Sequence, residues 1–404
     1  MIDLTNQMIY RIGNLDTDNQ RITYQMGTGK VLDRGSDNSV LYSKYLNIED
    51  SIRTYEGLKK QVEKTTAQNN VADSTVNEMK LTFDNIKSDL LKSLNSGMTR
   101  PDRLAVAANM EGMRENLITL SNTQVDGEYL FTGSDTTKQT YKKDDNYKIN
   151  GKVHFEGNAH LRNLAVDRNV YRQRGVTAHD LLMYNTDTTA SDQKISFKES
   201  EIVVDESGNT WKLNDNKDKL VKYYENGEAS GEYLDVSDDG GTPKTYTSET
   251  ISDAKDNDHI TDKTASGLVL QTKHSVFEDL NEIINALKGY KTQHTDDDDD
   301  GKQGDIATDE EVRDILSTNL ENMSKQYDAT NIGHAELGGR NKIFNTALDG
   351  ITSKITHYNI LMQETNGADM AKLAMESKSL EMTYNALYST IAKMNQLSLV
   401  NFLK

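Results

Sequence analysis

Apolar residues recur at alternating intervals of four and three residues at both ends of this chain. The N-terminal stripe, in which Asn19 is the one polar member, comprises Met8, Ile12, Leu15, Ile22 and Met26. The C-terminal stripe, interrupted at Ser377, comprises Met370, Leu373, Leu380, Tyr384, Leu387, Ile391 and Met394. This spacing is typical of coiled coils, and a helix with so narrow an apolar stripe needs a partner helix to be stable in water. We expect each terminus to pair with the other, and then with neighbouring copies of the chain.

The C-terminal tail continues this apolar character. Its sequence, LSLVNFLK, is nearly all apolar, whereas the ends of most chains are polar and frayed. We therefore add Leu399 and Phe402 to the two stripes and call the whole set the assembly seam. If the assembly seam exceeds what one chain can bury, the surplus marks contacts between subunits.

The middle of the chain has a different hydrophobic period. Alternating runs flank three turn signals, at Asn150-Gly151, Ser207-Gly208-Asn209 and Asn226-Gly227, and such signals predict β-hairpins. The stretch from Asp235 to Asp262 is rich in Gly, Asp, Ser and Thr, which indicates a loop. Helical patterns resume after two capping boxes, which begin at Ser275 and Thr308. The predicted fold is mainly α with a β-rich insert, in which the terminal helices pair as an elongated coiled coil or bundle and the middle β domain projects outward.

These changes of period predict five segments. Residues 1–40 form an N-terminal coiled-coil segment, which pairs with a C-terminal coiled-coil segment at 368–404. Residues 41–138 and 275–367 form the two halves of a helical bundle domain. Residues 139–274 form the β-rich outer domain between these halves.

Charge and composition argue against several classes of partner. The 404 residues include 46 Lys and Arg against 64 Asp and Glu, which gives a net charge of −18. Binding to nucleic acid or to anionic lipid requires clustered basic residues, so we expect neither nucleic acid nor a membrane as a partner. No stretch is apolar enough to cross a bilayer, and Met1–Tyr10 lacks the features of a cleaved secretory signal. The chain contains no cysteine, which fits either side of a membrane.

The sequence GTGK, Gly27 to Lys30, resembles the end of a phosphate-binding loop. A complete loop of that kind has a further glycine five residues before its second glycine, and Ser or Thr after its lysine. This chain has Tyr24 and Val31 at those positions, and a helical pattern precedes the box where a strand is required. We therefore predict a turn between two helices. The histidines show no metal-binding spacing and no GxSxG motif occurs, so we expect neither an enzyme nor a cofactor.

The acidic run DDDDDG is the one candidate for a cation. Asp296, Asp298, Asp300 and Gly301 match positions one, three, five and six of a calcium-binding EF-hand loop. Ala307 occupies position twelve, where a bidentate Glu is needed, and Gln303 replaces the usual hydrophobic residue at position eight. The pattern favours a solvated acidic loop, and a calcium-binding protein stays as the distant alternative function.

Four stretches resemble bacterial flagellins and hook-associated proteins. MIDLTNQMIYRI, followed by QMGTGKVLDRGSDN, is similar to the N-terminal segment of that family, and LSNTQVDGEYLFTGSDT resembles the box that closes its N-terminal helical region. GHAELGGRNKIFNTA and LYSTIAKMNQLSLVNFLK resemble its C-terminal helices. The Tyr-Leu-Phe-x-Gly box and the Leu-Ser-Leu ending are those of the hook-associated branch, not of flagellin itself. Where the family often has Pro-Ser-Asp-Asp-Pro, this chain has Gly35 to Ser39 without either proline.

This resemblance implies a structural adaptor that joins the hook-associated zone of the flagellum to the flagellin filament. It also implies a ring of copies in a tubular assembly, with another hook-associated protein on the hook side and flagellin on the filament side. Such proteins leave the cell through the flagellar type III channel without a cleaved signal peptide, after binding an export chaperone. The expected location is therefore the extracellular flagellum. A flagellin-like filament subunit, which polymerises indefinitely, is the alternative.

Overall fold

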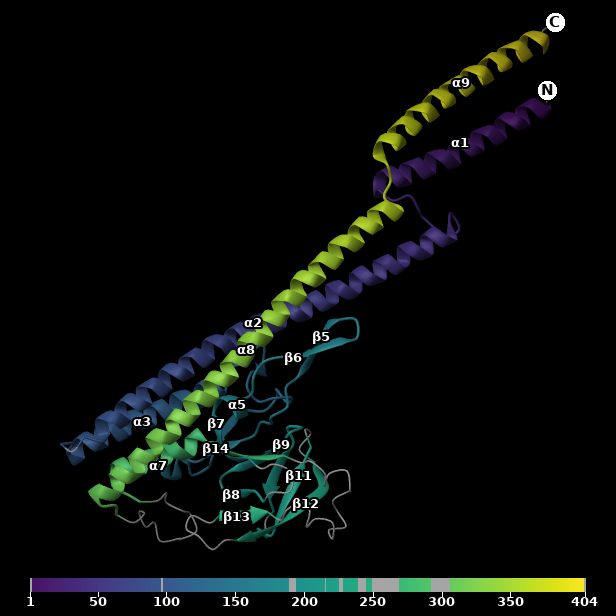
Figure 1. The fold of residues 1–404 in the computed structure, drawn as a ribbon. Helices are drawn as coiled ribbons and strands as arrows, with labels where there is room; N and C mark the ends of the chain where they lie inside the picture. Colours follow the sequence, from purple (N-terminus) through teal and green to yellow (C-terminus); the bar gives the residue numbers. More distant parts are fainter. Residues whose placement is uncertain are drawn as a thin grey trace. The chain divides into compact units, whose positions relative to one another are not determined.

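Long helices form both ends of the chain, and a β-rich insert lies between them, as the sequence predicts (Figure 1). The computed structural model describes residues 2–95, 97–188, 194–214, 216–224, 228–238, 245–248, 269–291 and 306–402. Its contacts define two compact units. The terminal unit comprises Met1–Lys60 and Leu348–Lys404, and the central unit comprises Gln61–Ala347. The finer division into five segments stays a prediction.

The terminal unit is built on two antiparallel helices. Helix α1, Ile2–Thr28, packs against helix α9, Met370–Phe402, so that both chain ends lie at the same end of the pair (Figure 1). The unit also includes the beginning of α2, Ser39–Ser93, and the end of α8, Asp309–Asn366. There the ring of Tyr55 stacks on that of Tyr358 with 5.7 Å between centroids.

A further apolar stripe, from Val76 to Leu90, recurs at intervals of three and four residues and predicts another helix, and the helical core of the central unit confirms it. Val76, Met79, Phe83, Ile86 and Leu90 of α2 are all fully buried. They pack with apolar residues of α3, Arg100–Ser121, of α7, Val276–Lys288, and of α8 in one continuous cluster. Two residues along a helix point to nearly opposite sides. Leu81 is therefore 63% exposed, although Phe83, two residues further on, is fully buried.

Side-chain caps set where these helices begin. At α8 the hydroxyl of Thr308 accepts a hydrogen bond from the Glu311 N–H at 3.3 Å, and the Glu311 carboxylate accepts one from the Thr308 N–H at 2.8 Å. This reciprocal pair is the predicted capping box. At α7 the predicted box is replaced by a single bond, because the Ser275 hydroxyl accepts from Phe277 N–H at 3.3 Å instead of from Glu278.

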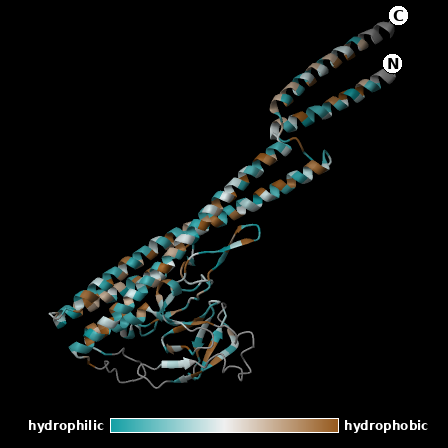
Figure 2. Cartoon of the chain, viewed as in Figure 1, coloured by the Kyte–Doolittle hydropathy of each residue, from teal (hydrophilic) through white to brown (hydrophobic). Residues whose placement is uncertain are grey.

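An eight-stranded antiparallel sheet dominates the insert. Its spatial order is β7-β14-β9-β10-β11-β12-β13-β8. The strands are β7 (Met183–Thr188), β8 (Ser196–Lys198), β9 (Ile202–Asp205), β10 (Thr210–Leu213), β11 (Lys219–Tyr223), β12 (Ala229–Asp238), β13 (Thr245–Ser248) and β14 (Leu270–Ser275). A separate apolar cluster that includes Trp211, Phe197 and Tyr246 fills one side of this sheet, and hydrophobic residues recur along its strands in Figure 2.

Smaller elements connect α3 to the sheet. They comprise two-stranded ribbons and two short helices: β1 (Gln124–Val125) with β2 (Glu128–Tyr129), β3 (Tyr141–Lys143) with β4 (Val153–Phe155), β5 (Asn163–Asp167) with β6 (Val170–Gln173), α4 (Tyr147–Asn150) and α5 (Ala178–Leu181). Every one of these ribbons is antiparallel.

The hairpin predictions had mixed outcomes. The turn at Ser207–Asn209 does join β9 to β10. Asn150-Gly151 does lie inside a hairpin, but the prediction of a strand directly before it is wrong. Residues Tyr147–Asn150 form a helical turn, and the paired strands are β3 and β4. Asn226-Gly227 lies outside the described residues, although the strands on either side of it, β11 and β12, pair.

The loop predicted from Asp235 to Asp262 is also partly wrong. Strand β12 continues to Asp238, and β13 at Thr245–Ser248 pairs with it, with Val236 opposite Ser248. Threonine, tyrosine and serine are well tolerated in strands when neighbouring strands supply partners. Composition alone therefore predicts a loop where part of the stretch, up to Asp238 and at Thr245–Ser248, is strand. The other residues of this stretch lie outside the described part of the chain.

A buried ionic cluster joins the sheet to the helices within the central unit. His274 of β14 lies between two carboxylates, with Nε2 3.2 Å from Asp279 Oδ1 and Nδ1 3.4 Å from Glu201 Oε1. Asp279 of α7 also accepts hydrogen bonds from Tyr184 of β7 and Asn322 of α8. Burial disfavours the charged imidazolium, but the two carboxylates outweigh it and raise the pKa of His274 to about 10. His274 is thus held in its charged form between two carboxylates, at the point where strand passes into helix.

The pKa of His274 predicts how stability varies with pH. In the unfolded chain histidine has its ordinary pKa of 6.5, so the stabilising charge is fully present below that pH and is lost as pH rises towards about 10. We expect the free energy of unfolding of the central unit, measured in urea, to fall across this window. Substitution His274→Gln leaves two buried carboxylates without their cation, which costs about 3–5 kcal/mol near neutral pH and removes the slope.

The matched control is His154→Gln, because the His154 side chain is 59% exposed. That variant should keep both the stability and the slope of the unaltered chain. A slope that persisted in His274→Gln would show that other groups cause it.

Candidate functional site

The structure places most of the assembly seam along the contact between α1 and α9. Ile22 and Leu373 are buried, with 3% and 5% of their surface exposed. Eight further members are half-buried: Met8, Ile12, Leu15, Leu380, Tyr384, Leu387, Ile391 and Met394. Met26 and Met370, at the end of the pair nearest the turns, are 40% and 50% exposed. The side chains of Leu399 and Phe402 lie outside the described residues.

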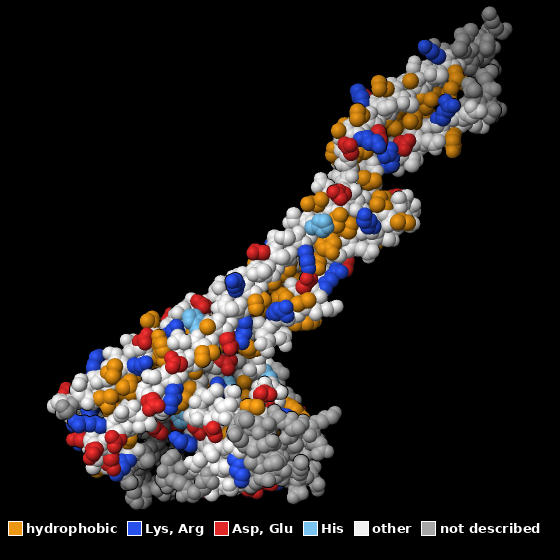
Figure 3. All heavy atoms as spheres, in the orientation of Figure 1, with side chains coloured by type: hydrophobic (Ala, Val, Ile, Leu, Met, Phe, Trp, Pro, Cys, Tyr) orange, Lys and Arg blue, Asp and Glu red, His pale blue; other side chains and the backbone are white. Residues whose placement is uncertain are grey.

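The α1–α9 pair also carries apolar side chains that no part of the described chain covers. Ile9 and Tyr10 on α1, and Met375, Met382 and Tyr388 on α9, are between 59% and 71% exposed. Figure 3 shows hydrophobic side chains along the visible face of these helices. Two helices cannot enclose one another, so a half-buried seam and exposed apolar side chains are what remains when such a pair has no further neighbour.

Two turns meet at the base of this pair, and one of them contains GTGK. Gly29 adopts a left-handed conformation with φ of 68°, which glycine favours, and Lys30 pairs with Gly367. The amide of Val31 donates to Asn366 O at 2.9 Å, and the amide of Ala368 donates to Gly29 O at 2.9 Å. The box thus forms the predicted turn between helices, and it is hydrogen-bonded to the turn that links α8 to α9.

Two buried amide side chains fix these paired turns, and the contacts of neither are predicted from the sequence. Asn366 is buried, and its Oδ1 accepts from the Leu32 N–H at 2.7 Å. Gln25, also buried, donates from Nε2 to Val31 O at 2.8 Å. Asn366-Gly367 was recognisable as a helix end, but its partner lies more than 330 positions away. No local sequence signal identifies such a contact.

The Gly35–Ser39 turn is ordered by side chains in place of the absent prolines. The carboxylate of Asp37 accepts hydrogen bonds from the amides of Asp33 and Arg34 at 3.1 and 3.0 Å, and these bonds lower the pKa of Asp37. Asn38 Oδ1 accepts from the Leu41 N–H at 3.0 Å, in the first turn of α2. An Asx-type turn and a helix cap therefore fix this box.

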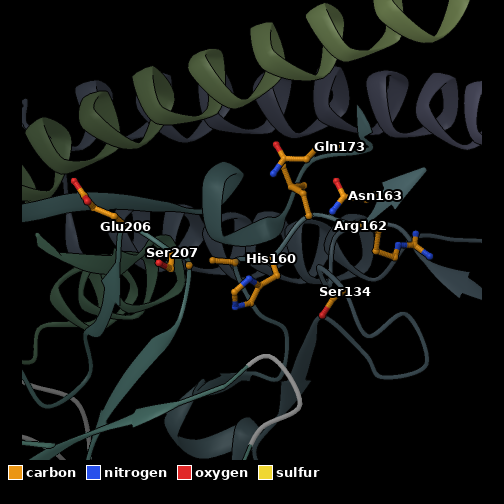
Figure 4. Close-up of a pocket in the computed structure, with 10 residues that line it drawn as sticks. Ser134, His160, Arg162, Asn163, Gln173, Glu206 and Ser207 are labelled. Carbon is orange, nitrogen blue, oxygen red and sulfur yellow. The ribbon is translucent and has the colours of Figure 1, made fainter. Parts of the chain in front are cut away.

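A polar hollow of about 590 Å³ lies between the base of the β5–β6 hairpin and the turn that joins β9 to β10. His160, Arg162 and Glu206 are among the residues that line it. Figure 4 shows Glu206 and Arg162 at opposite ends, with their side chains pointing away from one another. Catalysis requires polar groups that converge on one reacting atom, and this hollow does not provide such an arrangement.

The described part of the chain holds no group of three or more His, Asp or Glu side chains placed to bind a metal ion. The candidate calcium loop, Asp296–Asp300, lies outside the described residues. Within the described helices, none is both long enough and apolar enough to cross a bilayer.

Comparisons with known proteins identify the class of the N-terminal helices. Residues 4–136 match the family model of the bacterial flagellin N-terminal helical region. The resemblance read from the N-terminal motifs is thereby confirmed over that range, and the likeness of the C-terminal helices stays a prediction. No curated protein sequence matches the chain.

The solved structures that are similar to the chain include two flagellar proteins. One is hook-associated protein 3 from Legionella pneumophila, with 13% identity and a TM-score of 0.48 over 78% of this chain and 97% of that one. The other is FlgL from Xanthomonas campestris, with 12% identity and a TM-score of 0.47 over 78% of this chain and 98% of that one.

The paired turns lead to a prediction about Asn366. Substitution Asn366→Ala removes the acceptor for the Leu32 N–H, which is buried, and an unsatisfied buried donor costs about 1–3 kcal/mol. We expect faster amide hydrogen exchange at Leu32, measured by NMR or mass spectrometry. The control Asn366→Asp keeps an acceptor at the same position and should keep the amide protected. Equal exchange in both variants would rule out a role for this side chain.

Proposed function

We propose that this chain is a structural adaptor of the bacterial flagellum, which joins the hook-associated zone to the flagellin filament. The observation that carries the proposal is the α1–α9 pair with its exposed apolar side chains, in a chain whose residues 4–136 match the flagellin N-terminal helical region. The adaptor performs no chemistry. It acts by packing its terminal helices against those of neighbouring copies, in a ring within a tubular wall from which the β-rich insert faces outward.

The energetics of the exposed apolar side chains support assembly through this pair. Complete burial of one large apolar side chain contributes about 1.5–3 kcal/mol. The five side chains are each about two-thirds exposed, so burying the remainder offers roughly 5–10 kcal/mol. Immobilising one protein on another costs on the order of 4–15 kcal/mol. Burial of the exposed side chains therefore roughly offsets the cost of association. A neighbour also buries more of the half-buried assembly seam, and this further burial makes the free energy of association favourable.

The hook-associated sequence features favour an adaptor over a filament subunit. The Tyr-Leu-Phe-x-Gly box, which ends at Gly133, and the Leu-Ser-Leu ending at 397–399 are those of the hook-associated branch. A flagellin-like subunit remains the second candidate. The proposed partners are other copies of the chain, another hook-associated protein, flagellin and an export chaperone. The proposed route is type III export to the extracellular flagellum.

The test of this function is the flagellum of cells that lack the chain. We expect hooks without filaments in electron micrographs and flagellin released into the medium, because filament growth has no junction on which to begin. Re-expression of the chain should restore filaments. Filaments of normal length on hooks in the deletion strain would contradict the proposal, and purified chain that grows long filaments unaided would favour the filament subunit.

The assembly seam leads to a second prediction. Removing residues 395–404 deletes Leu399 and Phe402 and shortens α9, and the shortened pair then buries less apolar surface against neighbours. We expect the truncated chain to fail to restore filaments in the deletion strain. Its β-sheet and helical core should stay folded, since the central unit ends at Ala347; circular dichroism and urea unfolding of the purified chain measure this. Normal filaments with the truncated chain would show that the tail is dispensable.

A further inference from the structure

The β5–β6 hairpin is a ribbon whose second strand has no covering element. All four side chains of β6 are exposed, Tyr171 by 61% and Val170 by 37%. The strands pair only with one another among the described residues. Asn169, with φ of 59°, forms the tight turn at the tip. Isolated two-stranded ribbons are marginally stable in water, so a ribbon of this kind needs an anchor.

A charged network anchors the base of the hairpin. The Glu128 carboxylate accepts hydrogen bonds from Arg162 at 2.9 Å, Arg174 at 3.2 Å and Lys64 of α2 at 2.9 Å. Burial opposes ionisation of Glu128, but these partners outweigh it and hold the pKa of Glu128 at about 2. Arg174 also donates to Gln68 Oε1 at 2.6 Å. These bonds fix the base of the hairpin to α2 and so hold the tip of the hairpin in place.

The hairpin is basic in an acidic chain. Residues 162–174 contain four arginines and one aspartate, a net charge of +3, which leaves −21 for the remainder of a chain with net charge −18. Arg162 and Arg174 serve the anchor. Arg168 at the tip and Arg172 on β6 lie at the surface, where Arg172 also donates to Tyr171 O at 3.2 Å. The exposed surface of the hairpin therefore combines two guanidinium groups with the apolar side chains of Val170 and Tyr171.

A complementary stripe lies on α2. Glu78, Leu81 and Asp84 follow one another at intervals of three residues, all three are exposed, and Leu81 is 63% exposed. At 1.5 Å per residue the two carboxylates are about 9 Å apart along the helix. Arg168 and Arg172 are separated by four residues of ribbon, about 13 Å at full extension. The flexible arginine side chains span the difference, which allows each to meet one carboxylate across a shared apolar contact.

The hairpin cannot reach this stripe in its own chain. Arg174, two residues from Arg172, contacts Gln68, and 16 residues of helix separate Gln68 from Asp84. That separation is about 24 Å, and the hairpin extends from its base towards the start of α2, away from Asp84 (Figure 1). Any contact between the two surfaces therefore joins two copies. Because the surfaces differ, the contact is head-to-tail, and repeated contacts of this kind close into a ring when the rotation between copies allows it.

We propose that the β5–β6 hairpin of one copy docks on the Glu78–Leu81–Asp84 stripe of a second copy of this chain, with Arg168 and Arg172 against the two carboxylates. The inference rests on the proposed function, since it specifies which surfaces of the central unit meet when copies assemble. Charged pairs of this kind fix the register and exclude wrong partners more than they add affinity. The contact thus orients neighbouring copies, while the terminal helices supply most of the apolar burial.

Cross-linking in flagella tests the contact directly, because the chain has no cysteine of its own. The deletion strain is supplied with a chain that carries Arg172→Cys and Asp84→Cys, and isolated flagella are treated with a short bismaleimide. We expect a ladder of cross-linked multimers on a denaturing gel, since each copy offers one half of the contact on either side. Either single substitution should give monomer. A matched control pair, Arg172→Cys with Asp314→Cys on the exposed surface of α8, should also give monomer.

Charge reversal provides the second arm. Arg168→Glu with Arg172→Glu should reduce the amount of chain retained in isolated flagella several-fold, and adding Glu78→Lys with Asp84→Lys should restore it. The alternative is that the arginines only keep the exposed strand β6 from pairing with other strands. The charge reversal would then leave retention in flagella unchanged, and the proposal would be overturned. Chain present in flagella without a ladder would overturn the contact and leave the proposed function standing. Absence of the unaltered chain from flagella would overturn both.

Discussion

The structure depends on the need of two narrow apolar stripes for a partner. Helix α1 has no core of its own, and neither has α9, so each is stable only against the other or against a further helix. Their antiparallel pairing brings the first and last helices of the chain together. The rest of the chain therefore starts at the end of α1 and comes back to the start of α9, as an excursion from the helix pair. The paired turns around Gly29 and Gly367 are where that excursion begins and ends, and the hydrogen bonds of Asn366 make it a fixed point.

The pairing also explains why the terminal unit looks incomplete beside the central unit. In the central unit four helices and the adjoining ribbons enclose Phe83 and its neighbours completely. In the terminal unit, Ile22 and Leu373 are the only buried members of the assembly seam whose side chains the structure describes, because two helices have too few faces to surround a core. A chain with one enclosed core and one half-covered helix pair fits the proposed function, in which contacts between copies complete the burial of the terminal helices.

What the sequence predicts, and what it does not, follows the range of the interactions. Stripes and caps are local, so the α2 stripe from Val76 to Leu90 and the capping box at Thr308 are found at their predicted places. At Asn150-Gly151 the strand after the turn, β4, is found as predicted, but its partner is β3 and not the residues directly before the turn. His274 illustrates the limit: its partners come from residues 201 and 279, and no spacing rule links them. The same applies to Asn366, a recognisable helix end whose partner is distant in the chain.

The sheet enters and leaves the helical core through neighbouring strands. Thr188, at the end of β7, lies opposite Gln271, near the start of β14, in an antiparallel ladder. Cα atoms in such opposed positions are only about 5 Å apart. The segment between those two residues thus begins and ends at neighbouring positions, but its first part is tied to the helical core, because β9 pairs with β14 and Glu201 belongs to the buried cluster of His274. The later part starts after Asp205 and ends before Leu270, and these two residues also lie opposite one another. No described residue of 206–269 belongs to the helical core. Evolution can therefore lengthen, shorten or exchange this later part without disturbing the helices, and an engineer can graft a foreign domain there if its two ends lie close together.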